Sequence, residues 1–335
     1  WRVYRKMKAL VYTQEKTLVF QDYSDPKLAQ GDVLIKVDSV GICGSDMHAF
    51  LGHDSRRFPP LILGHEAAGV IVEGINKGTR VTVNPLVTCD VCDACLRGRN
   101  NICSNRQLIS MAPREGAFAE YLAIPYKNII AIPDNVNISH AALTEPVACG
   151  WHAVKLGITS LDIPIKKAKC LIIGGGAIGM GVALSLNSKG ATNITVVDNN
   201  PVRRGNLAKT SEVDLIIADQ VNQSVAYDLV FDAVGYSSTR SVASQACKPG
   251  GVIVHIGLGD SIEGLDVRRM TLQEITFIGT YTYTPQDFQE TALAIFNSEM
   301  GSFNWVEERS LKDGHKAFTD ILSGQVAASK IVLKP

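Results

Sequence analysis

Residues 169–198 read KCLIIGGGAIGMGVALSLNSKGATNITVVD, and this stretch decides the fold class. The apolar run from Cys170 to Ile173 predicts a short buried strand, and the glycines that follow it predict a tight turn. A helix is expected over about residues 177–189, and a second strand then ends at Asp198. This alternation of strand, turn, helix and strand is typical of a parallel βαβ unit.

The turn satisfies G-x-G-x-x-G, a pattern that is weak alone but more specific between a strand and a helix. Glycines let the backbone approach a pyrophosphate closely, and the N-terminal end of the helix attracts its negative charge. We therefore expect a dinucleotide to contact the residues of this turn, namely Gly174, Gly176, Ala177, Ile178 and Gly179.

Asp198 stands where a carboxylate hydrogen-bonds the adenosine ribose of a dinucleotide. A negative charge at that position repels a 2′-phosphate, so the sequence favours NAD over NADP. Arg203 is also expected near the cofactor, and with Arg204 it keeps NADP open as the alternative. The competing interpretation is a glycine turn without a ligand and arginines on a solvated helix face.

The chain on either side of this stretch shows two different patterns. Before it, short β-rich segments separated by Gly, Pro, Asp and Asn predict a compact, mostly antiparallel, barrel-like unit. A helical segment over residues 139–157, with Ser139 as its N-cap, leads into the βαβ stretch. After it, strands near residues 227–235, 250–259 and 275–281 extend the parallel sheet, a helix follows from Pro285, and a last strand covers 330–335.

Composition excludes several classes of protein. Lysine plus arginine equals aspartate plus glutamate at 33 each, so no basic field favours nucleic acid or a membrane surface. No window approaches the length of a membrane span, and no signal peptide is visible, which predicts a cytoplasmic enzyme. Met7 resembles a natural start, so we expect residues 1–6 to be an extension outside the fold.

Four cysteines follow the spacing C-x2-C-x2-C-x7-C, at Cys89, Cys92, Cys95 and Cys103. Tight steps of this kind let thiolates fold around one ion, and four of them leave no open coordination position, so a structural zinc is expected. Free or disulfide-linked thiols are the alternative, which the lack of an export signal disfavours. A zinc-ribbon module that binds nucleic acid is a further alternative, which the neutral charge disfavours.

Taken together, the motifs of this chain resemble those of the zinc-dependent medium-chain dehydrogenase/reductase family, which includes zinc alcohol, polyol and threonine dehydrogenases. The resemblance covers nearly the whole chain and rests on GICGSD at 41–46, GHE at 64–66, the four-cysteine segment, GAFAEY at 116–121, EP at 145–146, GGGAIG at 174–179 and KIVLKP at 330–335. It implies an α/β protein with a GroES-like, β-rich catalytic domain over residues 7–148 and 287–335. A Rossmann domain with a doubly wound parallel sheet and bound NAD, residues 149–286, is then inserted between them.

The resemblance also implies a catalytic zinc in addition to the structural one. It makes Cys43 and His65 zinc ligands and Glu66 a ligand or a close carboxylate, while Asp46 orients His65. The third protein ligand is expected to be Glu145, as in the polyol dehydrogenases of the family, rather than Cys149 one helical turn later.

For catalysis, the resemblance implies that Ser45 takes the proton of the substrate hydroxyl and passes it through the cofactor ribose to His48. The expected reaction is reversible oxidation of a secondary hydroxyl on a polyol, sugar alcohol or sugar-alcohol phosphate with NAD. A threonine-type amino alcohol or a simple alcohol is the alternative substrate. Rival classes are a zinc-free relative and a zinc-ribbon module. A homodimer or homotetramer is expected.

One connector departs from the family pattern. Between the segments DLIIAD and YDLVFD only QVNQSVA intervenes, which is shorter than the crossover that parallel strands usually need. Either a helix of the nucleotide-binding sheet is reduced to a loop, or residues are missing from the sequence; the pattern does not decide between them. Arg56 and Arg57 are candidate contacts for a substrate phosphate or carboxylate, although such a pair is more often a solvated loop charge.

Overall fold

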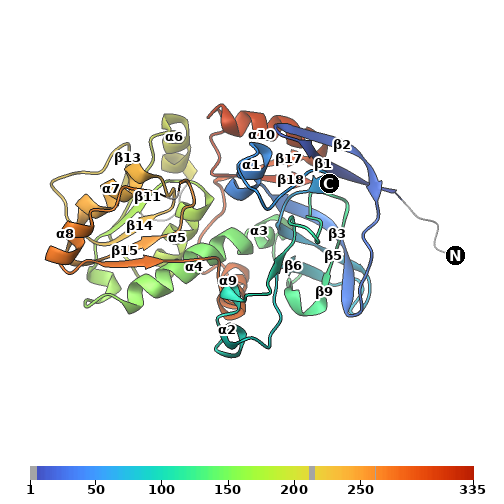
Figure 1. Cartoon of the computed structure of the whole chain (residues 1–335), viewed down its shortest axis with the longest axis horizontal. Coiled ribbons are helices and arrows are strands. Elements are labelled where there is room, and N and C mark those ends of the chain that lie inside the picture. The colour runs from blue at the N-terminus through green and yellow to red at the C-terminus, as the bar shows by residue number, and fades with distance from the viewer. Residues whose placement is uncertain (1–5, 211–215, 261) are drawn as a thin grey trace.

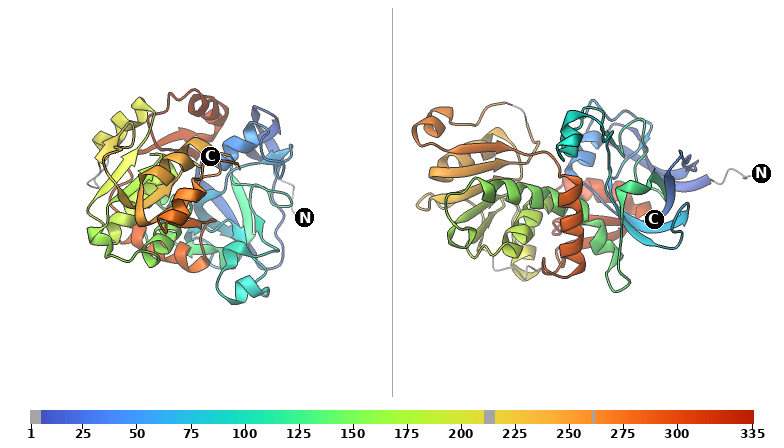
Figure 2. Two further views of the ribbon diagram at one scale, coloured as in Figure 1. Left: turned by 60° about the vertical axis from the view of Figure 1, so that its left-hand side comes forward. Right: turned by 90° about the horizontal axis from the view of Figure 1, so that it is seen from below.

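The computed structural model describes residues 6–210, 216–260 and 262–335. Residues 1–5 of the predicted extension lie outside the described residues, and the prediction is wrong for Lys6, which begins strand β1 (Lys6–Gln14) and pairs with Ser24. Two sheet-based lobes lie side by side, a parallel one and a largely antiparallel one (Figure 1). Figure 2 shows helix α9 (Pro285–Phe296) at the junction between the two lobes.

The apolar runs of the 169–198 stretch lie at the centre of a six-stranded, fully parallel sheet. Its strand order is β13 (Ile216–Ala218), β12 (Ile194–Val197), β11 (Cys170–Ile173), β14 (Tyr227–Asp232), β15 (Cys247–His255) and β16 (Thr276–Gly279). Strands buried on both faces read as continuous apolar runs, which is why β11 and β12 were recognisable in the sequence. The predicted doubly wound α/β fold is confirmed.

Helices cover both faces of this sheet. They are α4 (Thr144–Thr159), α5 (Ala177–Ser188), α6 (Pro201–Thr210), α7 (Ser237–Ala246) and α8 (Val267–Leu272). Alternate residues of the central strands point to opposite faces, so Ile172 packs in the core with α4 and α5 while Leu171 packs with α7. Gly179 allows α5 to approach the turn, because a Cβ there would lie 1.8 Å from the carbonyl oxygen of Gly174.

The crossover from β13 to β14 is a loop over residues 219–226, with no helix. Both explanations that the sequence left open are consistent with a loop at this position. Val221 and Val225 of this loop pack against the same side of the sheet as Leu171 and Val230. The loop thus covers part of the face that a crossover helix would otherwise bury.

The second lobe is built around a seven-stranded sheet that includes the C-terminal strand. Its path is β10 (Ile129–Ala131), β6 (Arg80–Val83), β5 (Glu66–Glu73), β3 (Asp32–Gly41), β18 (Lys330–Lys334) and β17 (Val306–Ser310), and β9 (Tyr121–Pro125) also pairs with β3. Smaller sheets join β2 (Thr17–Ser24), β1 (Lys6–Gln14) and β4 (Leu61–Ile62), and β7 (Leu86–Val87) with β8 (Gln107–Leu108). This is the expected β-rich unit, mostly antiparallel, and it is closed by the C-terminal tail.

The remaining helices connect or cover these strands. They are α1 (Gly44–Phe50), α2 (Asp93–Leu96), α3 (Ile138–Ala142), α9 and α10 (Gly314–Leu322), with 3₁₀ turns at Asn100–Ile102, Tyr126–Asn128, Ile165–Lys167 and Leu311–Asp313. Ser139 was expected to be an N-cap, and this is wrong: the side chain of Asn137 caps α3 by accepting from the Ser139 backbone N–H. Among the described helices, none has the length and apolar character needed to cross a membrane.

Asp287 ties α9 to α4 at the junction of the lobes. Its Oδ2 atom lies 2.7 Å from Nδ1 of His152, its Oδ1 atom accepts from Nζ of Lys155 at 2.9 Å, and it caps α9 through Thr284. Burial favours the neutral acid, but the contacts with His152 and Lys155 hold the pKa of Asp287 well below its usual range. The folded state therefore favours the charged carboxylate.

We predict that Asp287→Asn lowers the free energy of unfolding by about 2 kcal/mol at pH 7, because the buried carboxylate loses its charge-assisted contact with Lys155 and its other hydrogen bonds are weakened. Since the folded pKa is lowered, this contribution is present above the unfolded pKa of about 3.9 and is lost as pH falls further. Urea unfolding at pH 7 and at about pH 3 measures both values. Glu290→Gln on the same helix is the control, and an equal difference between wild type and the Asp287→Asn variant at both pH values would contradict the assignment.

Candidate active site and metal-binding sites

Three of the predicted ligands come together at the ends of β3 and β5. The sulfur of Cys43, a ring nitrogen of His65 and a carboxylate oxygen of Glu66 all lie within 4.8 Å of one another. Strand pairing places Gly41 directly opposite Glu66, and a Cβ at Gly41 would lie only 1.9 Å from Oε2 of Glu66. A glycine is therefore required at position 41 for the glutamate to reach this cluster.

Asp46 supports the cluster from the first turn of α1. Its Oδ1 atom lies 3.6 Å from Nδ1 of His65, while its two oxygens accept from the backbone N–H groups of Gly64 and Cys43 at 3.1 and 3.0 Å. Burial opposes a charge on His65, but the Asp46 carboxylate and the Cys43 thiol beside it raise its pKa well above the ordinary value. Asp46 thus lies where it would orient the imidazole.

Glu66 is fully buried, and only one of its two carboxylate oxygens accepts a hydrogen bond from a described residue. Nζ of Lys330 donates to Oε1 at 2.6 Å and also to the backbone carbonyl of Ile42 at 2.7 Å. Oε2 is buried and has no hydrogen-bond partner among the described residues. A cation-binding role fits an oxygen in that state, because a buried carboxylate oxygen without a partner is costly.

Glu145 lies nearby but outside the group of three. It belongs to the first turn of α4, and the hydroxyl of Tyr283 donates to its Oε1 atom at 2.8 Å. Burial raises the pKa of Glu145 to about 7, and the charge of Glu66 acts in the same direction, whereas His65 opposes it. Cys149 was not favoured as the third ligand in the sequence. Burial raises the pKa of its thiol, and the nearby Glu145 and Cys43 raise it further.

The two relay residues share one face of α1. Ser45 and His48 are three positions apart on this helix, so both side chains lie on the same side. Neither side chain is fully exposed or fully buried. Burial lowers the pKa of His48, and His53 acts in the same direction. The imidazole is therefore neutral near pH 7 and able to accept a proton.

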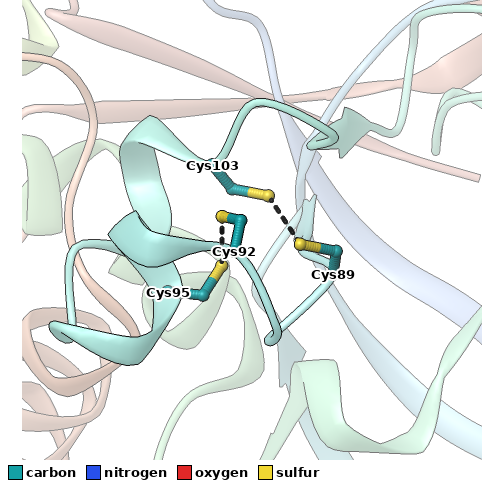
Figure 3. A group of neighbouring side chains, drawn as sticks. All are labelled: Cys89, Cys92, Cys95 and Cys103. Atoms are coloured by element: carbon teal, nitrogen blue, oxygen red, sulfur yellow. Dashed lines mark hydrogen bonds between the residues drawn. The ribbon is translucent and has the colours of Figure 1, made fainter.

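The four cysteines form a second cluster, shown in Figure 3, where their side chains point toward one another. All four sulfurs lie within 4.8 Å of one another, with 3.5 Å between Cys92 and Cys95 and 3.4 Å between Cys89 and Cys103. Backbone N–H groups of Val91 and Cys92 lower the pKa of Cys89 to about 6. Four thiol groups this close together fit a tetrahedral zinc site in which every coordination position is taken by sulfur.

The glycine turn and Asp198 also come together. Asp198 is buried and accepts from the backbone N–H of Gly175 at 2.8 Å, from Nη1 of Arg203 at 2.9 Å and from the N–H of Asn200 at 2.8 Å. These elements line a cavity of about 870 Å³ that extends along α7 and the 219–226 loop. A Cβ at Gly176 would meet no atom of the described residues within 4 Å, so the turn leaves space in front of it.

A smaller cavity of about 240 Å³ lies between the two lobes. One side is formed by Cys43, Gly44 and Glu66, and the other by Gly176, Ala177 and Ile178 of the glycine turn. Arg203 and Lys330 also line it. The cavity therefore connects the cysteine, histidine and glutamate cluster with the predicted dinucleotide site.

Sequence reasoning missed the role of three side chains near this site. Lys330 begins the strand KIVLKP. Its position next to an apolar run was the one feature of the sequence that could have indicated a buried lysine. Tyr283 gave no signal, because only the fold brings it to Glu145. Arg57 was considered as an anion contact, but its side chain is only 1% exposed and pairs with Asp54.

Comparison with known proteins places the chain in a family. Residues 29–134 match the family model described as alcohol dehydrogenase GroES-like domain, and residues 177–298 match the one described as zinc-binding dehydrogenase. L-galactonate-5-dehydrogenase of Escherichia coli (strain K12) is 32% identical over 84% of this chain and 85% of its own length. Sorbitol dehydrogenase of Bacillus subtilis (strain 168) is 31% identical over 83% of each chain.

Among solved structures, acetophenone reductase from Geotrichum candidum in complex with NAD has a TM-score of 0.86 and 27% identity. The match covers 100% of this chain and 99% of that one. The fold, the two family models and the relatives above 30% identity all indicate the same family. The chain therefore belongs to the zinc-dependent medium-chain family of alcohol and polyol dehydrogenases.

Proposed function

We propose that this protein reversibly oxidises a secondary hydroxyl of a polyol, sugar alcohol or sugar-alcohol phosphate to a ketone, with NAD as the hydride acceptor. The observation that carries the proposal is the 240 Å³ cavity, which has Cys43 and Glu66 on one side and the glycine turn on the other. Such a cavity brings a metal-binding set and a dinucleotide turn to one reaction volume.

The metal assignments are part of the proposal. Cys43, His65, Glu66 and Glu145 form the catalytic zinc site, and Cys89, Cys92, Cys95 and Cys103 hold a structural zinc. The partnerless Oε2 atom of Glu66 and the close sulfur and nitrogen donors support the first assignment. A zinc ion bound there supplies Lewis-acid activation of a hydroxyl group.

The protein's own residues then manage the proton. Ser45 Oγ accepts the hydroxyl proton of the substrate, and the neutral imidazole of His48 receives a proton at the outer end of the relay. Asp46 fixes the ring of His65, and Tyr283 fixes the carboxylate of Glu145. On the cofactor side, the turn at 174–179 takes the pyrophosphate while Asp198 and Arg203 take the ribose.

Substrate class is supported by the relatives. L-galactonate-5-dehydrogenase and sorbitol dehydrogenase are named for polyhydroxylated substrates, and both align over more than four fifths of the chain. The division into residues 7–148 with 287–335 and residues 149–286 is proposed on the pairing of β18 with β3. A homodimer or homotetramer formed along the β16 edge and a cytoplasmic location complete the proposal.

The function is tested by NADH formation across polyols, polyol phosphates, sugar acids, simple alcohols and threonine. We expect turnover of at least one polyhydroxylated substrate, with loss of activity on treatment with a strong zinc chelator and recovery on addition of zinc. Turnover that persists in protein shown to lack zinc would contradict the proposed chemistry.

Metal content tests the ligand assignments separately from activity. We expect two zinc ions per chain in the wild type, one after Cys95→Ser and one after Cys43→Ser, measured by mass spectrometry of the metal. Glu66→Gln and Glu145→Gln are compared in the same way. The substitution that causes the larger loss of zinc identifies the carboxylate that contributes more to binding the catalytic ion. Cys247→Ser, a change at a buried cysteine of β15, is the control and should keep both ions.

Cofactor preference tests the role of Asp198. We expect wild-type protein to prefer NAD over NADP, and Asp198→Ala to reduce that preference by roughly 30-fold in kcat/KM, which corresponds to about 2 kcal/mol. Removing the carboxylate ends its repulsion of a 2′-phosphate and frees Arg203. Asp219→Asn removes a charge from the same cavity and should leave the ratio nearly unchanged; an equal effect of both changes would contradict a specific ribose contact.

A further inference from the structure

Arg57 is a buried cation beside the proposed active site that none of the roles above uses. Its side chain is 1% exposed. Nη1 donates to Oδ2 of Asp54 at 2.5 Å, and Nε donates to the backbone carbonyl of Ser110 at 3.0 Å. These two contacts hold the planar guanidinium in one orientation.

The remaining nitrogen faces two hydroxyl groups. Nη2 of Arg57 lies 3.5 Å from Oγ of Ser45 and 3.4 Å from Oγ of Ser110. Ser110 Oγ in turn lies 3.5 Å from Nδ1 of His65. The guanidinium is therefore in direct reach of the proposed relay serine and one residue away from the proposed metal-binding histidine.

Asp54 helps to fix this arrangement through its ion pair with Arg57. The Asp54 side chain is 7% exposed, and Arg56 donates to it through Nε and Nη2 at 2.9 and 3.0 Å. Burial opposes charge on Asp54, but these contacts lower its pKa to about 2. Arg57 is thus already paired with a carboxylate, and a buried, paired guanidinium is a poor site for a substrate phosphate or carboxylate.

An arginine side chain has donors only and does not lose its proton in proteins. When Nη2 approaches Ser45, the serine oxygen must be the acceptor. One lone pair of Oγ then faces the guanidinium, the second is available to the substrate hydroxyl, and the serine proton is directed to a different acceptor. The contact therefore selects one of the orientations that an isolated serine hydroxyl adopts.

We propose that Arg57 is a positioning residue that acts through Ser45 and fixes the direction in which this hydroxyl passes a proton. The inference rests on the proposed function, because it concerns the relay of that reaction. Arg57 differs from Asp46 and Lys330, which contact the metal-binding side chains instead. Its contribution is expected in the turnover step and not in binding of the cofactor.

A double-mutant cycle tests this role on the zinc-loaded enzyme with a polyol that the wild type oxidises. Arg57→Met, Ser45→Ala and the double variant are compared in kcat, in KM for NAD and in KM for the polyol. We expect Arg57→Met to lower kcat about 10-fold or more while KM for NAD stays within about twofold. In the background of Ser45→Ala the same change should cost less than about twofold, because the group through which Arg57 acts is absent.

Controls separate positioning from folding. Zinc content and NADH affinity by fluorescence should be the same in Arg57→Met and wild type at a temperature where both are folded. The melting temperature of Arg57→Met should fall, because the buried Asp54 carboxylate loses one of its partners. Arg57→Lys keeps a charged donor and should recover part of kcat, and if Arg57→Met does not fold, the cycle is repeated with Arg57→Lys. Ser110→Ala, which removes the second hydroxyl, should change kcat much less than Ser45→Ala.

Equal losses of kcat on Arg57→Met with and without Ser45→Ala would overturn the inference and leave the proposed function intact. Loss of zinc or of NADH binding in both Arg57 variants would also overturn it, by assigning Arg57 to the framework of the site. A wild-type protein that oxidises no alcohol in the panel would overturn the proposed function and this inference together.

Discussion

The pairing of β3 with both β5 and β18 is the constraint on which the proposed active site depends. At the end of β3, Gly41 lies opposite Glu66 of β5 and opposite Val332 of β18. One register therefore brings Cys43 next to His65 and Glu66 and brings Lys330 within 2.6 Å of Glu66. A slip by one residue would turn these side chains to the other face of the sheet. The pairing of the C-terminal strand β18 with β3 therefore helps to position active-site residues that are far from it in the sequence.

The parallel lobe contributes to the same site from the opposite side. Its glycine turn lies at the carboxyl end of β11, and such ends of parallel strands are where ligands bind in open α/β sheets. Cys43 and Gly176 line one cavity although they belong to different lobes. Helix α9 and Asp287 hold α4 at the junction, and α4 carries Glu145. The contacts of Asp287 with α4 therefore help to fix both the junction between the lobes and the position of Glu145.

Local patterns in the sequence predicted the alternating strands and helices of the parallel lobe and the cysteine cluster, whereas the residues of the proposed active site came from the resemblance to a family. The strand, turn and helix at 170–188 and the cysteine spacing at 89–103 depend on neighbours in the chain, so periodicity and spacing revealed them. Tyr283 and Lys330 could not be assigned in this way, because their partners are distant residues, Glu145 and Glu66. The N-cap of α3 was misplaced by two residues because Asn and Ser are both good caps and alignment with the helix start decides between them.

Buried charge explains why these distant partners matter. Lys330 with Glu66 and Arg57 with Asp54 place two ion pairs in or beside the site, and Asp46 lies 3.6 Å from His65; each of these side chains is at most 7% exposed. Burying such pairs is costly in stability, since desolvation offsets much of their attraction. They persist where fixed orientation is useful to chemistry, because a paired group in a dry site cannot rotate toward water when charge develops on a substrate. Arg57 fits this logic: its pairing with Asp54 removes its mobility, and what remains is a single donor group directed at Ser45 and Ser110.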